Sequence, residues 1–356
     1  NKFGVEMQPF IQQYSRAYLH RTQHFNGVPQ RLGDIQHDIQ GHVSELLSKA
    51  VNVGSLDRQV TTEDKEKLLE ALKGWGALDK DYRYKKSLET SKQRGFSVYP
   101  GGGLMPNEQA STPLPLDDIL QSGVWGDIYA NHTNYMHSPT MFQPVGGMGK
   151  IGDAFTRECQ DMITLNAKVT EIRQDDSGVT VSYVDSNNED GPVKTARADW
   201  CVCTIPLSIL SQLPINVSKP MRDAIAAVPY ETSFKVGLEF KRRFWEEDEW
   251  IYGGVTYTDM PIKQISYPSQ DMFKSGSGVL LGGYGYGPTS YKFNSLAPQE
   301  RIEAALAYGK HIHPQYLKEF RSGTSMVWHR MPWTLGCYGI WTKETRDQHY
   351  KTLCSI

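Results

Sequence analysis

The chain has 356 residues, 39% of them hydrophobic, which is enough for one large core or two ordinary ones. Lysine and arginine total 38 against 40 aspartate and glutamate residues, and this near-neutral balance excludes the electrostatic footprint of a protein that binds nucleic acid or anionic membranes. No apolar run approaches the ~20 residues that cross a bilayer. We therefore expect a soluble, two-lobed protein that acts on small molecules, and the compartment, cytoplasmic or secreted, stays open.

Residues 1–130 are predicted to form a mainly helical domain. Apolar residues recur every three or four positions in MQPFIQQYSRAYLH (7–20) and in IQGHVSELLSKAV (39–51). The stretch TTEDKEKLLEALKGWG (61–76) begins with a threonine cap and ends at a glycine. A Pro- and Gly-rich connection then leads into a further short helix near residue 120.

The spacing of apolar residues changes from helix to strand after about residue 160. SFKVGLEFKRRFW (233–245) alternates, with Phe234 and Val236 on one face and Lys235 on the other. The remaining predicted elements are a hairpin around an Asp-Ser-Gly turn (167–185), a buried strand ADWCVCTIP (198–206), a short helix (221–230), a buried strand (276–287) and a helix (297–313). This order predicts an α+β fold.

The five cysteines include no C-x-x-C pair and specify neither a zinc site nor a disulfide framework. Cys201 and Cys203 lie in the predicted buried strand, where we expect them to be core residues. The ten histidines have no paired ligand spacing, and the consecutive acids of WEEDEW (245–250) are typical of a solvated loop. We therefore expect no metal site.

Gly147-Met-Gly149-Lys-Ile-Gly152 has the G-x-G-x-x-G spacing of a dinucleotide-binding turn. Such a turn requires a buried parallel strand before its first glycine. The preceding SPTMFQPV contains Pro139 and Pro144, which a central strand does not tolerate. The glycines are therefore interpreted as the entry to an ordinary helix.

The segment 232–272 resembles the flavin-dependent amine oxidase superfamily and, within it, the L-amino-acid oxidases. It has a lysine on a strand, KRRFWEED, a Gly-Gly pair, TDMP and ISYPS, in that order. The run CTIPLSILSQLPINVSKPMRDAIAAVPY before it and VWHRMPWTLGCYGIW after it resemble further segments of the family. The similarity covers residues 140–350 well and the helical part weakly.

The resemblance implies a substrate-binding mixed-sheet lobe with a helical insertion, part of an FAD/NAD(P)-binding (GR2-type) fold whose Rossmann core is largely missing from this chain. The sequence lacks the family's N-terminal G-x-G-x-x-G strand and its C-terminal FAD segment, so we expect it to correspond to the middle of such an enzyme. The implied domains are the helical domain (1–130), an FAD-domain segment with a helix and a hairpin (131–200), the substrate-binding sheet domain (201–330) and a segment that returns to the FAD domain (331–356).

The resemblance assigns FAD-binding roles to Gly146, Gly147, Val169 and Trp328. In the family, a Gly-Gly segment opens a helix, the strand valine packs on the adenine, and the tryptophan packs near the flavin. Lys235 matches the lysine that holds a water against flavin N5 and assists reoxidation by O2. The pattern alone favours a solvated strand residue at Lys235, and only the resemblance points to a role at the flavin.

The resemblance also assigns substrate contacts to Tyr267, Trp333 and Tyr338, although each is also explained as a structural aromatic. Tyr267 matches the tyrosine that helps to bind the substrate carboxylate. The implied reaction is oxidation of an L-amino acid by FAD and O2 to a 2-oxo acid, ammonia and hydrogen peroxide. The alternatives are a monoamine or polyamine oxidase, or a non-catalytic subunit, with a homodimer or a complementary chain from the same precursor as partner.

Overall fold

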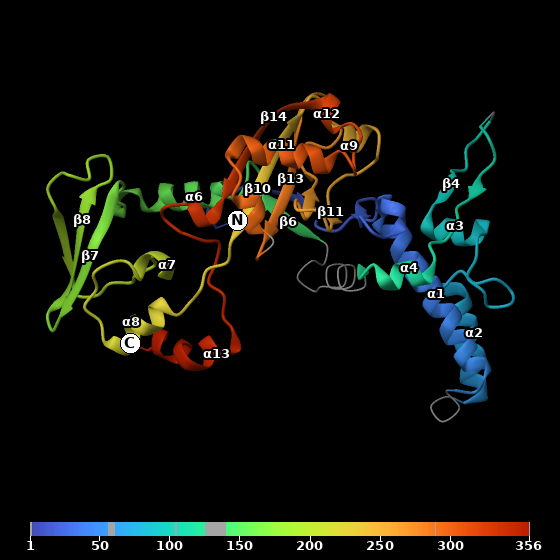
Figure 1. Cartoon of the computed structure of the whole chain (residues 1–356), viewed down its shortest axis with the longest axis horizontal. Coiled ribbons are helices and arrows are strands. Elements are labelled where there is room, and N and C mark those ends of the chain that lie inside the picture. The colour runs from blue at the N-terminus through green and yellow to red at the C-terminus, as the bar shows by residue number, and fades with distance from the viewer. Residues whose placement is uncertain (1, 56–60, 104, 125–139, 289, 356) are drawn as a thin grey trace.

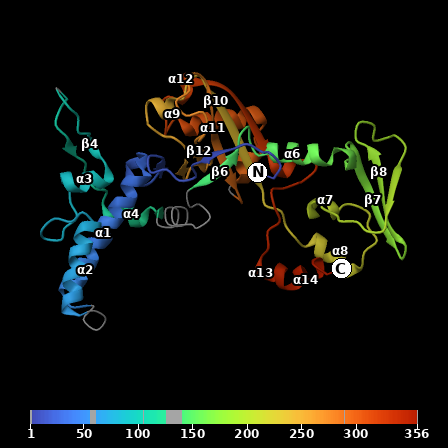
Figure 2. The same cartoon turned by 180° about the vertical axis from the view of Figure 1, so that it is seen from behind.

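The computed structural model describes residues 2–55, 61–103, 105–124, 140–288 and 290–355. Three parts lie in a row: a helical lobe at one end, a seven-stranded central sheet, and a three-stranded outer sheet at the other end (Figure 1). Figure 2 shows the same arrangement from behind, with the N-terminal residues close to the central sheet. The mixture of helices and sheets confirms the predicted α+β class.

The central sheet joins strands from the two ends of the sequence. All neighbouring strands are antiparallel except β11 and β2, which are parallel. The order across the sheet is β14 (Phe320–Val327), β10 (Ser233–Phe240), β13 (Gly278–Tyr286), β12 (Gln264–Ser266), β11 (Val255–Thr258), β2 (Tyr18–His20) and β3 (Gln30–Arg31).

One face of the central sheet carries the main core. Phe234, Val236, Leu238 and Phe240 of β10 are fully buried, as their alternation predicts. Helix α11 (Pro298–Gly309) covers this face with its apolar side. The burial of each large apolar side chain stabilises the fold by about 2 kcal/mol. Lys235 is exposed on the opposite face, which we call the open face.

The helical lobe consists of α1 (Leu32–Asn52), α2 (Thr62–Trp75), α3 (Leu88–Arg94) and α4 (Leu116–Gln121). The predicted helices over 39–51 and 61–76 are confirmed, and the Thr61 hydroxyl caps α2 by accepting from the Asp64 amide. A buried ion pair, Arg94 Nε to Asp38 Oδ1 at 2.7 Å, holds α3 against α1. The short strands β4 (Phe96–Val98) and β5 (Gln109–Ala110) complete the lobe.

The predicted helix over residues 7–20 is wrong. This stretch forms β1 (Met7–Phe10), which pairs with β6 (Met141–Pro144), and β2, which pairs with β3 and β11. Pro9 disfavours a helix interior, and pairing with strands distant in sequence overrides the apolar spacing. The boundary at residue 130 stays a prediction, but β2 and β3 belong to the central sheet.

The outer sheet consists of β7 (Ala167–Asp175), β8 (Gly178–Asp185) and β9 (Lys194–Ala198), and the predicted hairpin over 167–185 is confirmed. Helix α6 (Gly149–Cys159) precedes it, and α7 (Leu207–Leu210) and α8 (Lys219–Ala226) follow. The other short helices are α9 (Phe244–Glu247), α10 (Ser290–Asn294), α12 (Tyr316–Glu319), α13 (Lys343–Thr345) and α14 (Lys351–Leu353), with single turns at Phe25–Gly27, Gln160–Met162, Trp328–Arg330 and Arg346–Tyr350.

The predicted buried strand over 198–206 is wrong for residues 199–205, which have no regular secondary structure. Cys201 and Cys203 are exposed rather than core residues, and Trp200 and Val202 expose 82% and 89% of their surface. A strand requires a hydrogen-bonded neighbour, and none of the described strands runs beside this segment.

Two features are absent from the part of the chain that the structure describes. None of its helices combines the length and apolar character that crossing a membrane demands. Its His, Cys, Asp and Glu side chains form no group of three or more suited to a metal ion.

Candidate active site

Lys235 stands on the open face of the central sheet between two other side chains of that face. On β10 it is paired with Tyr284 of β13 on one side and with Met326 of β14 on the other. Its Nζ lies 5.0 Å from the centroid of the Tyr284 ring, a cation–π distance. The strand register therefore holds the ammonium group over an aromatic surface and away from the core.

Tyr284 contacts this lysine, Tyr286 and Tyr338 lie near Tyr284, and we call the four residues the Lys235 cluster. Tyr284 and Tyr286 lie two residues apart on β13, with ring centroids 5.4 Å apart in an edge-to-face arrangement. The Tyr338 carbonyl accepts from the Glu231 amide at 2.8 Å, which ties this tyrosine to the start of β10. Burial, and then the neighbouring Tyr286, raise the pKa of Tyr284, so its hydroxyl stays protonated.

Tyr284 and Tyr286 were not among the residues predicted from the sequence. The alternation in GGYGYG already places both on one face of a strand. That this face is also the face of Lys235 depends on the pairing of β10 with β13, which no local pattern contains.

The two predicted tryptophans lie in the segment that follows β14. Trp328 begins a single helical turn directly after β14 and is half-buried. The Trp328 carbonyl accepts from the Thr334 hydroxyl at 3.4 Å, which folds the segment back on itself. Trp333 and Tyr338 expose 55% and 52% of their surface, so both aromatic faces are available for contacts.

Tyr267, predicted to contact the substrate carboxylate, is buried inside the sheet lobe. Its hydroxyl lies 2.8 Å from the Thr256 hydroxyl and 2.6 Å from Nε2 of His313. Nδ1 of His313 donates to Oε1 of Glu249 at 2.7 Å, so the Tyr267 hydroxyl belongs to a chain of buried hydrogen bonds. Burial raises the pKa of Tyr267 well above its usual range. These partners are those of a structural hydroxyl.

The prediction of a solvated loop at WEEDEW is wrong for two of its acids. Glu246 and Glu249 are buried, and each has a basic partner: Arg243 for Glu246 and His313 for Glu249. Burial acts to raise the pKa of Glu249, but the hydrogen bond and charge of His313 hold it below its usual value. Residues 244–247 form the short helix α9, which turns these carboxylates inward.

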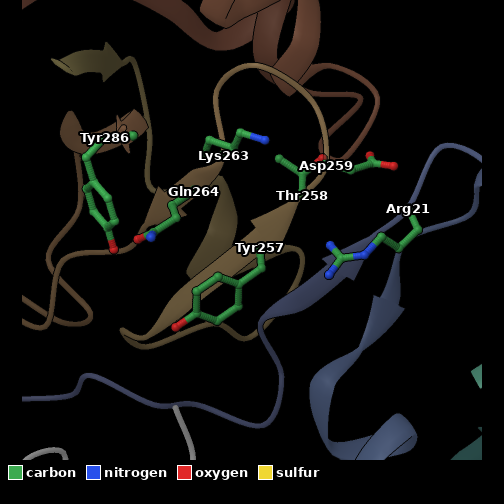
Figure 3. A pocket seen from close by; sticks show the side chains of 8 residues that line it. Arg21, Tyr257, Thr258, Asp259, Lys263, Gln264 and Tyr286 are labelled. Carbon is green, nitrogen blue, oxygen red and sulfur yellow. The ribbon is translucent and has the colours of Figure 1, made fainter. Parts of the chain in front are cut away.

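A cavity of about 390 Å³ extends the open face beyond the Lys235 cluster. Figure 3 shows Tyr257, Gln264 and Tyr286 over neighbouring strands, and Tyr257 and Gln264 are direct partners in the register. Polar side chains close its far end; the complete lining is Arg21, Tyr257, Thr258, Asp259, Lys263, Gln264, Gly285 and Tyr286. Because Tyr286 belongs to both, the cavity and the Lys235 cluster are continuous.

The family model for flavin-containing amine oxidoreductases matches residues 1–354. The chain belongs to this family. The amine oxidoreductase family uses a flavin, and FAD is therefore the cofactor.

Two relatives of this chain are L-amino-acid oxidases. That of Bothriechis schlegelii is 28% identical over 90% of this chain and 62% of its own length, and that of Siganus canaliculatus is 31% identical over 58% and 40%. The chain thus spans about half the length of the curated relatives it matches. The cyclohexylamine oxidase structure from Brevibacterium oxydans has the same fold, with a TM-score of 0.58 at 14% identity over 99% of this chain and 75% of that one.

The residues assigned to FAD by the resemblance lie at two places in the structure. Gly146 and Gly147 have φ of 80° and 95° in the turn between β6 and α6, a conformation that favours glycine. A Cβ at Gly147 would meet nothing within 4 Å, so the backbone there is open to a ligand. Val169 is half-buried on β7, whereas Trp328 follows β14 on the central sheet. The open backbone at Gly147 and the half-buried side chains of Val169 and Trp328 are compatible with a dinucleotide. Trp328 follows Val327, which pairs with Phe234 next to Lys235.

Proposed function

We propose that the protein oxidises an L-amino acid to a 2-oxo acid, ammonia and hydrogen peroxide, with FAD as its cofactor. The observation that carries this proposal is the Lys235 cluster, a cation held over tyrosine rings on the open face of the sheet. The choice of an amino acid over other amines rests on the similarity to L-amino-acid oxidases.

Each residue of the cluster has a distinct task in this reaction. FAD, when bound, accepts two electrons from the substrate amine and passes them to O2. The Lys235 ammonium group lies on the exposed sheet face, where its charge stabilises negative charge that develops on reducing oxygen. The Tyr284 ring holds this ammonium group at a cation–π distance, and Tyr286 packs against Tyr284. Trp333 and Tyr338 supply aromatic walls for the substrate side chain.

The first test is peroxide formation by the chain loaded with FAD, alone and together with a complementary chain from the same precursor. Visible flavin absorbance after gel filtration reports cofactor binding. A panel of L-amino acids, the matching D-amino acids and simple amines is then assayed for peroxide and ammonia. The proposal expects both products in equal amounts with L-amino acids. Flavin-loaded protein that is inactive on the whole panel contradicts it and favours a non-catalytic subunit.

Oxidation of plain amines is the second candidate, and the environment of Tyr267 favours it. Its hydroxyl already bonds to Thr256 and His313, so its single O–H donor is not available to a substrate carboxylate. Peroxide from simple amines, with none from the corresponding L-amino acids, would decide for this candidate.

A further inference from the structure

A second polar cavity lies away from the Lys235 cluster, where the helical lobe meets the segment between β1 and β2. Its volume is about 460 Å³. Ser15 and Arg16 come from that segment, Asp34 and His37 from α1, and the remaining walls from α3, β4 and their neighbours. Figure 1 places α1, α3 and β4 in the helical lobe, at the far end from the outer sheet.

Three arginines line this cavity, and two of them are committed to other groups. Arg94 donates to both carboxylate oxygens of Asp38, at 2.7 and 3.0 Å. Arg31 donates to the Glu249 carbonyl at 3.3 Å and stacks on the Tyr18 ring at 3.9 Å. Neither guanidinium is therefore available as the main anion receptor of the cavity.

Arg16 is the third arginine, and its charge has no counter-ion among the described residues. Its guanidinium carbon lies 4.8 Å from the Trp250 ring centroid, so one planar face is fixed by stacking. Its Nε is buried and has no hydrogen-bond partner in the described structure. A buried donor without a partner costs about 1–3 kcal/mol, which a bound carboxylate recovers.

Asp34 lines the same cavity and likewise makes no hydrogen bond or ion pair with the described residues. A Cβ built on Gly95 would lie 3.6 Å from Asp34 Oδ1 and 3.1 Å from the Tyr99 hydroxyl, so both atoms face the backbone of Gly95. Arg16 and Asp34 do not pair within 4 Å of each other, and the cavity thus presents one unsatisfied cation and one unsatisfied carboxyl group.

We propose that this cavity binds the head group of a free α-amino acid, with its carboxylate on Arg16 and its ammonium group on Asp34. An aromatic wall adjoins these two residues: Phe96 packs edge-on against Tyr99 at 5.9 Å, and Tyr99 against Trp250 at 6.4 Å. The wall matches an aromatic or large apolar side chain. This is an accessory binding site, and it does not depend on the proposed oxidase function.

The test uses three probes that share a phenyl ring and differ in charge: L-phenylalanine, 3-phenylpropanoate and phenethylamine. Titration calorimetry on the complete chain without flavin separates binding from turnover. We expect L-phenylalanine to bind at least about tenfold more tightly than either single-charge probe, because each charged hydrogen bond is worth at least about 1.5 kcal/mol. No saturable binding of L-phenylalanine overturns the proposal.

Two variants assign the two ends of the ligand. Arg16→Gln should weaken the binding of L-phenylalanine and of 3-phenylpropanoate alike, by about tenfold or more. Asp34→Asn should weaken the binding of L-phenylalanine and leave the binding of 3-phenylpropanoate unchanged. Lys92→Gln is the matched control, because Lys92 lines the cavity but pairs with Glu89 at 2.7 Å, and it should bind like the parent chain.

Two results would contradict the site. Equal affinities for L-phenylalanine and 3-phenylpropanoate, with no effect of Asp34→Asn, would describe a simple anion site. Unchanged binding in both Arg16→Gln and Asp34→Asn, with unfolding curves like the parent, would place the ligand elsewhere. Lys235→Met should not alter this binding, so failure here and failure of the oxidase proposal are separable.

Discussion

At the scale of single residues, a substitution of Lys235 tests the proposed reaction most directly. Replacing it with methionine keeps the length of the side chain and removes the charge held over Tyr284. In the flavin-loaded protein we expect reoxidation by O2 to slow by about 100-fold, the usual cost of removing one charge-stabilising group. Reduction by substrate under anaerobic stopped-flow conditions should change little. An equal loss in both half-reactions would contradict a role specific to oxygen.

A substitution of Tyr267 distinguishes two roles of its hydroxyl: a structural role in the core and a role in binding substrate. Tyr267→Phe removes the partner of both Thr256 and His313 inside the core. Urea unfolding should report a loss of about 1–3 kcal/mol, because two buried groups lose a hydrogen bond. Tyr286→Phe is the control, since Tyr286 is exposed. Unchanged stability together with a raised KM for amino acids would instead support the carboxylate role.

Asp34 makes the stability of the chain depend on pH. Burial raises its pKa to about 6, against the opposing charge of Arg94; Asp38 raises it further, and Arg31 and Arg16 lower it. Burial also lowers the pKa of His37 on the same helix. Between about pH 4 and 6 the folded state keeps a proton on Asp34 that the unfolded state, with a pKa near 3.9, has released.

The free energy of unfolding should therefore fall as pH rises through this window and then level off. Asp34→Asn has no carboxyl group to titrate, so its stability relative to the parent should increase between pH 4 and 6, by on the order of 3 kcal/mol. Urea unfolding at several pH values measures the difference. A difference that does not change with pH would show that Asp34 titrates normally.

At the scale of secondary-structure elements, the sequence predicted correctly those elements whose interacting residues are close together in the chain. Helix α2 has its cap and its apolar stripe within one stretch, and the β7–β8 hairpin has its turn between its own strands. Strand β2 instead depends on β11, more than 200 residues later, so its apolar spacing suggested a helix. The family resemblance singled out Lys235 but not its neighbour Tyr284, because only the strand register joins the two residues.

Two glycines in neighbouring helices give opposite expectations for the same substitution. A Cβ at Gly41 of α1 would lie 2.2 Å from the ring of Tyr84, which is buried and donates its hydroxyl to Asp38. Gly41→Ala should therefore destabilise the chain by about 1–3 kcal/mol through overpacking. Gly74 of α2 has nothing within 4 Å of its Cβ position, and Gly74→Ala should stabilise by about 0.5 kcal/mol. Thermal unfolding of both variants against the parent tests the pair; equal effects would contradict this packing.

At the scale of the whole molecule, the two sheets differ in how well they are covered. The central sheet has a core face under α11, whereas β9 of the outer sheet is exposed along its whole length. Around the outer sheet, large apolar side chains face solvent: Met162, Leu165, Val193, Trp200 and Val202, each more than half exposed. An exposed apolar stretch such as that at Trp200 and Val202 is typical of a surface that another polypeptide or a ligand covers.

The exposed segment at Trp200 and Val202 makes a prediction about the isolated chain. A Trp200→Ser, Val202→Ser double variant should bind markedly less of a hydrophobic fluorescent dye and elute as a smaller species, because it removes two adjacent side chains that are more than four-fifths exposed. The far-ultraviolet spectrum should not change, since residues 199–205 belong to no helix or strand. Val53→Ser, at a single exposed valine after α1, is the control and should leave dye binding close to that of the parent. Dye binding and elution that are identical in the double variant and the parent would mean that this segment is covered in solution.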